Sequence, residues 1–594
     1  MKPTIVPETP LPSTSRDELW SSDAIARMLQ ALDVPWVALV PGASFRGLHD
    51  SLVNHIGNQQ PQMLLCLHEQ SAIAMAHGYA KASGRMMGAI LHSNVGLLNG
   101  SMGIFNAWCD RVPMLVLGAT GPWDAAKRRP WIDWIHTVSD QGALVRGFTK
   151  WDNQPASVPA AYDALLRAAQ MARTAPCGPT YVNLDAGLQE AKLGDLPPLP
   201  DASRFQAPEP PRPAPELMAR AAALLSGAAA PVIMVGRGRR TIESWRARVA
   251  LAEKLGARVV TDLKPGASFP TRHPLHVGPP GTYLSEAAVR VVREADVVLA
   301  LDWIDLAGTL KQVYADRPAS AKIVSASVDV HLHRGFGMEY FGLPPVDVQL
   351  LVEPDVAVPL LLEACRARAD TPPVAAAPEP ARRAHEVLSL RAVADALNDA
   401  AEGVDVCLTR LPLGWPGESR HFDHPLDYLG GDGGAGVGAG PGITVGAALA
   451  LKGTGRVPIG ILGDGDYLMS VTALWTAAHY RIPALFLICN NRSFYNDEAH
   501  QERVARLRGR PVENKWIGQR INEPDIDLAM LAVAQGAKGI GPVTDPDKLR
   551  SAIAQGMAAV QDGDVVVIDA RVRPGYDADI SGERAAMQER MARR

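Results

Sequence analysis

Residues 461–494 have the sequence ILGDGDYLMSVTALWTAAHYRIPALFLICNNRSF, and this stretch decides the fold. It opens on the end of an apolar strand, and Gly463-Asp464-Gly465 can then turn the chain sharply because glycine has no Cβ. Residues 468–480 have the apolar spacing of a helix, and residues 484–489 form a second buried-strand run. We therefore expect the aspartate and Asn491 at the C-terminal ends of two parallel strands, where open α/β sheets bind ligands.

Three oxygen atoms are expected to meet at this edge. They are a carboxylate oxygen of Asp464, the amide oxygen of Asn491 and the backbone carbonyl of Ser493. A site whose protein ligands are all oxygen atoms suits Mg²⁺ bound together with a diphosphate, because the ion keeps its other coordination positions for phosphate and water. The sequence therefore predicts a magnesium and diphosphate site, with an ordinary strand-turn-helix-strand unit as the alternative.

The order of these features resembles the diphosphate-binding motif of thiamine-diphosphate (ThDP) enzymes. The resemblance implies ThDP and Mg²⁺ as cofactors. It also implies that the diphosphate and the metal are bordered by Gly463, Asp464, Gly465, Asp466, Asn491 and Ser493.

The bulk composition sets limits on the class of protein. With 594 residues the chain is long enough for three or four domains, and its net charge of -4 gives no global field for nucleic acid or a membrane surface. The N-terminus has no apolar core of signal-peptide type, and the six cysteines are scattered without CxxC spacing. We expect a cytoplasmic protein that binds neither nucleic acid nor a membrane.

Two stretches rich in proline and alanine, at 196–216 and 369–380, divide the chain. Alternating short apolar runs and helical patterns fill the blocks between them, as is typical of parallel α/β layers. We expect an α/β fold of three doubly wound parallel-sheet domains, and the resemblance makes them pyrimidine-binding, central and diphosphate-binding in that order. The expected ranges are 18–195, 213–366 and 384–575, followed by a C-terminal tail or lid at 576–594. The predicted strands are 36–40, 63–67, 87–91, 113–118, 180–184, 231–235, 257–261, 296–301, 322–328, 404–408, 458–462, 484–489 and 564–570.

An acidic residue, Glu69, stands at a predicted strand-to-helix junction among mostly apolar neighbours. A carboxylate there is costly unless it has a partner or a task, although a glutamate in the first turn of a helix is also stabilised by the helix dipole. The segment from His68 to Ala80 resembles the glutamate motif of ThDP enzymes. Glu69 would then hydrogen-bond the N1′ ring nitrogen of the cofactor's aminopyrimidine.

A glycine-rich stretch at 434–442 can approach a cofactor closely and leads into a predicted helix at 443–451. In related enzymes a bulky aliphatic side chain at the position of Val437 supports the thiazolium ring, next to Gly438. Valine is smaller than the usual residue there, and a flexible glycine turn is the alternative.

A histidine, His92, follows the predicted strand 87–91 on the ligand side of the sheet. The surrounding sequence is similar to the benzoylformate decarboxylases, which implies that His92 faces the substrate and returns a proton after C–C cleavage. The alternative is a histidine bonded to backbone. The second catalytic histidine of those enzymes has no counterpart at 299–306, so His136 is the candidate substitute, with an ordinary surface histidine as the alternative. Ser44 lies one residue from the position of their substrate-binding serine.

The resemblance leaves the reaction open. The basic segment 492–520 could bind the phosphates of a CoA thioester, with a solvated helix face as the alternative. Residues 438–442 and 97–100 also resemble the 2-hydroxyacyl-CoA and oxalyl-CoA lyases. The favoured function is a C–C lyase, most of all a 2-oxoacid decarboxylase of benzoylformate type with carboligase activity. The alternatives are an acyl-CoA lyase or decarboxylase, an acetolactate-synthase-like transferase, and a paralogue that binds the cofactor without catalysis. The substrate would be a small 2-oxoacid or acyl-CoA.

Two further expectations come from the resemblance. Residues 231–240 resemble the start of the central domain, which binds FAD or ADP in some relatives, but the stretch around Asp302 lacks their FAD pattern. We therefore expect no FAD. In this superfamily the two ends of ThDP are held by different subunits, which implies a homodimer or homotetramer with active sites at the subunit interface.

Overall fold

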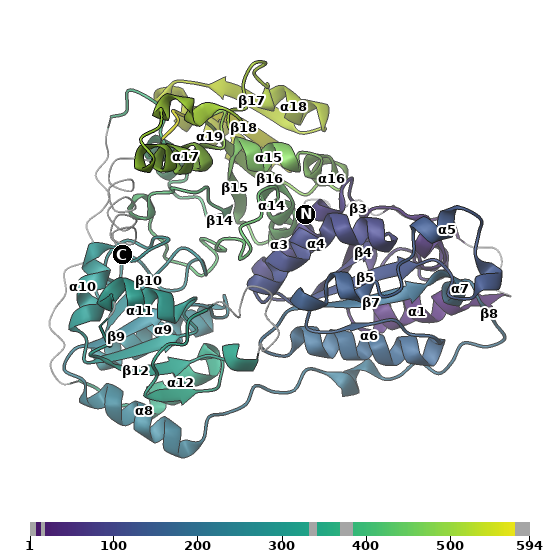
Figure 1. Cartoon of the computed structure of the whole chain (residues 1–594), viewed down its shortest axis with the longest axis horizontal. Coiled ribbons are helices and arrows are strands. Elements are labelled where there is room, and N and C mark those ends of the chain that lie inside the picture. Colours follow the sequence, from purple (N-terminus) through teal and green to yellow (C-terminus); the bar gives the residue numbers. More distant parts are fainter. Residues whose placement is uncertain (1–7, 13–17, 316, 332–340, 369–383, 576–594) are drawn as a thin grey trace.

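The structure is a computed structural model that describes the whole chain except residues 1–7, 13–17, 316, 332–340, 369–383 and 576–594. Three parallel sheets, each flanked by helices, follow one another along the chain (Figure 1). This confirms the predicted α/β fold of three parallel-sheet domains. The predicted tail or lid at 576–594 lies outside the described residues.

The N-terminal sheet has six parallel strands in the order β3-β2-β4-β5-β7-β6. Neighbouring residues of one strand enter different cores, as when Leu115 packs on one face and Val116 on the other, so both faces are covered. The strands are β2 (Trp36–Leu39), β3 (Gln62–Leu65), β4 (Met87–Leu91), β5 (Met114–Thr120), β6 (Asp152–Asn153) and β7 (Pro179–Asp185), and β1 (Leu19–Trp20) pairs separately with β8 (Lys192–Leu193). The α-helices are α1 (Ser21–Ala31), α2 (Arg46–Asp50), α3 (Glu69–Ser83), α4 (Ser93–Cys109), α5 (Ile132–Ile135), α6 (Val158–Arg173) and α7 (Ala186–Gln189).

The central sheet has five parallel strands in the order β10-β9-β11-β12-β13. Ile233 and Val232 enter separate cores on its two faces. The strands are β9 (Pro231–Val235), β10 (Arg258–Thr261), β11 (Val297–Leu301), β12 (Lys322–Ala326) and β13 (Val348–Leu350). The helices are α8 (Pro215–Gly227), α9 (Ile242–Leu255), α10 (Glu286–Glu294), α11 (Leu306–Tyr314) and α12 (Pro354–Ala364).

The C-terminal sheet also has five parallel strands, in the order β14-β15-β16-β18-β17. Its strands are β14 (Val406–Arg410), β15 (Val457–Gly463), β16 (Ala484–Asn490), β17 (Lys538–Val543) and β18 (Val565–Arg571). Its helices are α13 (Leu390–Ala400), α14 (Gly440–Leu451), α15 (Asp464–Met469), α16 (Ala473–His479), α17 (Tyr495–Leu507), α18 (Leu528–Ala534) and α19 (Pro546–Gln561).

Helices α3 and α14 join the N- and C-terminal sheets in one shared core (Figure 1). Two glycines allow their close crossing. A Cβ on Gly78 would lie 2.0 Å from the carbonyl oxygen of Ile443, and one on Gly446 would lie 1.9 Å from that of Met75. Glu69 begins α3 and the glycine-rich loop leads into α14, so this crossing sets the spacing of two predicted cofactor-binding elements.

The predicted strands all appear within two residues of their expected ends. The single helix expected over 468–480 is wrong. The chain instead forms α15 from Asp464, leaves helical geometry at Ser470 (φ −140°), and restarts as α16 at Ala473. The edge strands β6, β13 and β17 were not predicted, because they are short or carry little of the apolar pattern of a buried strand.

Among the helices of the described residues, none combines the length and the apolar character that a membrane crossing requires.

Candidate active site

The first part of the site lies at the C-terminal ends of β15 and β16. Gly463 ends β15 and Asp464 begins α15, so the carboxylate sits at the turn itself. The N–H of Gly465 donates to Oδ1 of Asp464 at 2.9 Å. The N–H of Ser493 donates to Oδ2 of Asp464 at 3.2 Å and to Oδ1 of Asn491 at 2.9 Å. The structure therefore brings the predicted carboxylate, the predicted amide and Ser493 together.

The chemistry of this edge fits a bound cation. Asp464 is buried, and burial raises the pKa of its carboxyl to about 6. Its described hydrogen bonds come from backbone N–H groups, and no ion pair with a cationic side chain is present among the described residues. A Cβ on Gly463 would meet no atom within 4 Å, so the space beside the turn is open. A metal ion would supply positive charge beside the Asp464 carboxylate, and a diphosphate would fill the open space beside the turn.

No cluster of three or more His, Cys, Asp or Glu side chains suited to a metal occurs in the part of the chain that the structure describes. The side-chain donors at this turn are instead the Asp464 carboxylate and the amide oxygen of Asn491, which both accept from the N–H of Ser493. Such a set suits a hard ion that shares its coordination with phosphate and water, and so it fits Mg²⁺.

Asp466 serves the glycine-rich loop. Its Oδ1 accepts hydrogen bonds from the N–H groups of Gly438, at 2.7 Å, and Gly440, at 3.2 Å. Its Oδ2 accepts from Nε of Arg410 at 2.8 Å. Because these contacts occupy the carboxylate, a direct bond from Asp466 to the cofactor is not needed to explain its position. Val437 projects from the same loop and is 48 % exposed.

The second part of the site surrounds Glu69, the first residue of α3. The side chain of Glu69 is buried, and Nδ2 of Asn99 donates to its Oε2 at 3.2 Å. A Cβ on Gly96 would lie 3.2 Å from Oε1 of Glu69, so the lack of a side chain there leaves room for the carboxylate. Helix α4, which carries Asn99 and Gly96, therefore fixes the orientation of the predicted acid.

The third part of the site is a pair of histidines. His92 follows β4 directly and occupies the position before the first residue of α4. Its Nδ1 lies 2.8 Å from Oγ of Ser44, and its ring meets that of His136 edge-on, with centroids 4.6 Å apart. The sequence left the roles of Ser44 and His136 open, and the structure brings both to His92.

The surroundings of His92 favour its neutral form. Burial lowers the pKa of His92, and the charges of His136 and Arg129 lower it further, while Glu69 acts in the opposite direction. A neutral imidazole can both donate and accept a hydrogen bond, and it gains positive charge readily when an anion approaches.

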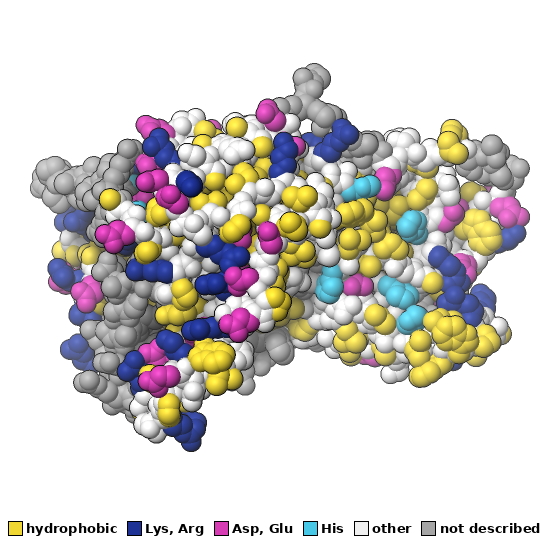
Figure 2. Space-filling model, turned by 90° about the horizontal axis from the view of Figure 1, so that it is seen from above, with side chains coloured by type: hydrophobic (Ala, Val, Ile, Leu, Met, Phe, Trp, Pro, Cys, Tyr) yellow, Lys and Arg dark blue, Asp and Glu magenta, His cyan; other side chains and the backbone are white. Residues whose placement is uncertain are grey.

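Exposed apolar side chains border these three parts. On α4, Val95, Leu98 and Met102 are 43 %, 57 % and 37 % exposed and follow helical spacing, so they form one stripe. Apolar and histidine side chains are prominent over the N-terminal domain, in the right half of Figure 2. Leu67 and Met469 add exposed apolar surface next to Glu69 and to the glycine-rich loop. Apolar area of this kind marks a surface for a partner or a ligand.

The end of β9 does not form an open phosphate site in this structure. Arg237 points toward Asp302 and donates to the carbonyl of Cys109. Asp302 is already bonded by Arg111, at 3.1 and 3.2 Å, and by Ser327 at 2.7 Å. The Gly-Arg-Gly segment at 236–238 is therefore committed to holding the central domain against the N-terminal domain.

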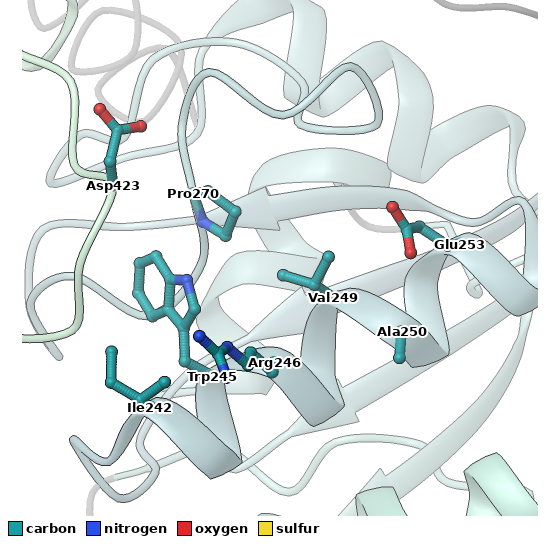
Figure 3. Close-up of a pocket in the computed structure, with 8 residues that line it drawn as sticks. All are labelled: Ile242, Trp245, Arg246, Val249, Ala250, Glu253, Pro270 and Asp423. Atoms are coloured by element: carbon teal, nitrogen blue, oxygen red, sulfur yellow. The ribbon is translucent and has the colours of Figure 1, made fainter.

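A hollow of about 500 Å³ lies where the central domain meets the segment around residue 423 (Figure 3). Trp245 and Arg246 of α9 face Pro270 and Asp423 across it. None of the predicted site residues lines it, so the candidate active site is defined by its side chains rather than by this hollow.

The candidate residues lie where strands lead into helices in two α/β domains. Three family models of thiamine pyrophosphate enzymes match the chain: the N-terminal TPP binding domain at 19–145, the central domain at 218–331 and the C-terminal TPP binding domain at 414–570. The chain belongs to the ThDP-dependent enzymes.

Curated relatives have several activities. A sulfoacetaldehyde acetyltransferase of Rhodobacter capsulatus is 33 % identical over 295 residues, which are 49 % of this chain and only 44 % of the relative. A benzoylformate decarboxylase of Pseudomonas aeruginosa is 29 % identical over 455 residues, 73 % of this chain and 79 % of the relative. A probable acetolactate synthase large subunit of Methanocaldococcus jannaschii is 26 % identical over 587 residues, 90 % of this chain and 89 % of the relative.

Solved structures share the fold. The 4-hydroxybenzoylformate decarboxylase of Rhodococcus jostii RHA1 has a TM-score of 0.74 at 20 % identity, and the match covers 94 % of this chain and 100 % of that one. The benzoylformate decarboxylase of Polynucleobacter necessarius has a TM-score of 0.77 at 19 % identity, covering 94 % and 99 %. At this identity the likeness concerns the fold alone.

Sequence reasoning missed two residues of the site. No role was predicted for Asn99, although it is the hydrogen-bond partner of Glu69. Arg410 was not noted at all. Its position as a charged residue at the end of a buried strand is a signal that could have been used, because ligand-side strand ends carry functional side chains in these sheets.

Proposed function

We propose that this chain is a ThDP- and Mg²⁺-dependent C–C lyase, and that it is a 2-oxoacid decarboxylase of benzoylformate type with carboligase activity as a second outcome. The observation that carries the proposal is the grouping of His92, Ser44 and His136 in the domain that also holds Glu69. The match to a benzoylformate decarboxylase over most of both chains supports it.

Each end of the cofactor has its own set of residues. Asp464, Asn491 and Ser493 would hold Mg²⁺ and the diphosphate, with Gly463 and Gly465 leaving room for them. Glu69 would bond the N1′ atom of the aminopyrimidine, and the loop with Val437 and Gly438 would support the thiazolium. When bound, ThDP supplies a carbon nucleophile that adds to the carbonyl of the substrate and accepts electrons as the adjacent bond breaks.

The protein's own groups handle the protons and the substrate carboxylate. Glu69, buried and fixed by Asn99, can share a proton with the pyrimidine ring. Ser44 Oγ holds Nδ1 of His92, so Nε2 of His92 is left to face a substrate. The positive charge of Arg129 near His92 favours an anionic substrate, which supports a 2-oxoacid.

We further propose a homodimer or homotetramer with active sites at the subunit interface. The exposed stripe of Val95, Leu98 and Met102 on α4 runs beside Glu69 and its partner Asn99. A second copy would cover this apolar surface and exclude water from the acid. The domain limits 18–195, 213–366 and 384–575 are proposed with it. A cytoplasmic location is also proposed, supported by the six free cysteines.

One alternative rests on a particular surface. Helix α17 and the residues that follow it present Arg503, Arg508 and Arg510 at an exposed position, close in sequence to Asn491. Arginine binds phosphate well, so a CoA thioester is the second candidate substrate. The match to a sulfoacetaldehyde acetyltransferase supports an acyl transferase instead, but it covers less than half of that relative.

A substrate panel separates these functions. The purified protein with ThDP and Mg²⁺ should release CO₂ from an aromatic 2-oxoacid, and cleavage of 2-hydroxyacyl-CoA or acyl transfer to an aldehyde would favour the alternatives. Glu69→Gln should abolish turnover while the fold is retained. Glu18→Gln, an exposed residue paired with Lys192, is the matched control and should keep full activity. An active Glu69→Gln enzyme would contradict the role given to Glu69.

A further inference from the structure

A single guanidinium connects two carboxylates from different segments at the base of the glycine-rich loop. Arg410, the last residue of β14, donates from Nε to Oδ2 of Asp466 at 2.8 Å. Its Nη1 pairs with Oδ1 of Asp432. The three side chains are 13 %, 9 % and 4 % exposed, so both contacts lie in a largely desolvated setting, where charged hydrogen bonds are strong.

The two carboxylates hold opposite ends of one loop. Asp432 is its first residue, and Asp466 accepts the N–H groups of Gly438 and Gly440 at its other end. Arg410 therefore bridges the start and the finish of loop 432–440. The geometry is specific to arginine, because one planar fork reaches both acids, whereas a lysine offers a single point of charge.

Backbone bonds and packing, rather than charged groups, hold the middle of this loop. The N–H of Ala435 donates to the carbonyl of Asp432, and the N–H of Ala439 donates to the carbonyl of Gly436 at 3.3 Å. Gly434 and Gly436 pack against Asn106 of α4, whose buried amide has no described hydrogen-bond partner there. Val437, at the tip, is half exposed. The position of Val437 therefore depends on where the two ends of the loop are fixed.

A second contact ties the start of the loop to α3. Nζ of Lys81 donates to the carbonyl of Gly431, the residue before Asp432, and pairs with Asp110 at 2.8 Å. Lys81 lies on the helix that begins with Glu69. The Arg410 bridge therefore closes a continuous set of contacts between that helix and the first turn of α15.

We propose that Arg410 is a positioning residue. Its ion pairs with Asp432 and Asp466 act as a clip that links the two ends of loop 432–440 and so hold Val437 at a fixed position in the cofactor site. The clip itself follows from the contacts of the chain. Its effect on ThDP rests on the proposed function, in which Val437 supports the thiazolium. Arg410 itself touches neither the cofactor nor the substrate in this assignment.

Two variants and a control test the clip in the full-length protein. Arg410→Gln removes the charge, and Arg410→Lys keeps the charge without the fork. Arg456→Gln is the control, because Arg456 is equally buried (10 % exposed) and bonds Asp427 and the carbonyl of Val406 at the opposite end of β14. Hydrogen exchange of the cofactor-free proteins reports on the loop, and calorimetric titration with ThDP and Mg²⁺ reports on binding.

In Arg410→Gln the amides of 434–440 should exchange about tenfold faster or more, since a buried charge pair is lost, while exchange elsewhere in the sheet is unchanged. The dissociation constant of ThDP should rise by a similar factor, kcat at saturating ThDP should fall, and KM for the substrate should stay constant. Arg410→Lys should be intermediate, and Arg456→Gln should leave the loop as in the wild type.

Loop exchange that is equal in Arg410→Gln and the wild type would overturn the inference, as would equal loosening in Arg456→Gln. The exchange measurement needs no cofactor. If the wild-type protein binds no ThDP, the proposed function is refuted. The hydrogen-exchange measurement still decides separately whether Arg410 links the two ends of the loop.

Discussion

The crossing of α3 and α14 makes a sharp prediction for Gly446→Ala. The added Cβ would lie 1.9 Å from the carbonyl oxygen of Met75, and a van der Waals contact of about 3.4 Å requires the helices to separate by roughly 1.5 Å. The obstacle is backbone on a neighbouring helix, so no side-chain rotation relieves it. Overpacking of this kind costs about 1–3 kcal/mol.

The consequence for function follows from what the two helices carry. Glu69 starts α3, and the loop with Val437 precedes α14, so separation of the helices displaces each of them within the cofactor site that it serves. A misplacement of about 1 Å in such a site lowers the rate by roughly 10²-fold. We therefore expect Gly446→Ala to lower kcat at saturating ThDP by about two orders of magnitude and to lower the thermal midpoint.

The control and the contrary result are equally specific. Gly227 ends α8, and a Cβ there would meet no atom within 4 Å, so Gly227→Ala should leave kcat unchanged and stabilise slightly, by about 0.5 kcal/mol. Steady-state kinetics and thermal unfolding of the three proteins decide the matter. Wild-type kcat and an unchanged midpoint in Gly446→Ala would show that the crossing does not set the site.

Three other changes have defined outcomes. ThDP with Mg²⁺ at about 100 times Kd should stabilise the wild type by about 2.7 kcal/mol and should not stabilise Asp464→Ala, as thermal shift assays would show; equal stabilisation would exclude Asp464 as a ligand. Burial and the neighbouring histidine lower the pKa of His92 from 6.5, so the folded protein binds fewer protons than the unfolded chain at low pH, and its stability should fall as the pH drops below 6.5. In His92→Gln this fall in stability should be smaller. Identical curves of thermal midpoint against pH for the variant and the wild type would refute the contribution of His92. Tyr480→Phe removes the hydroxyl that accepts from the N–H of Leu65 and donates to Glu8, and it should cost about 1–3 kcal/mol in chemical denaturation; a loss within about 0.5 kcal/mol, as for a surface change, would contradict it.

Much of the architecture could be predicted because its determinants are local. The strands β9, β11, β15 and β16 are continuous apolar runs, and a parallel sheet covered on both faces requires such runs. The GDG turn and Glu69 were recognised from their positions at strand ends. The short edge strands were not, because they lack a buried pattern, and the break between α15 and α16 has no proline or glycine to announce it.

By itself the sequence determined the parallel α/β class, most of the strand positions, and the membership that GDG, NN and the glutamate motif indicate. Only the tertiary structure decided which distant side chains meet: Ser44 and His136 at His92, Asn99 at Glu69, and Arg410 between two acids. The reason is physical. Strand and helix periodicity depends on neighbours a few residues apart, whereas a hydrogen bond or ion pair between segments depends on how whole helices and sheets pack, and that information lies in no short stretch of the chain.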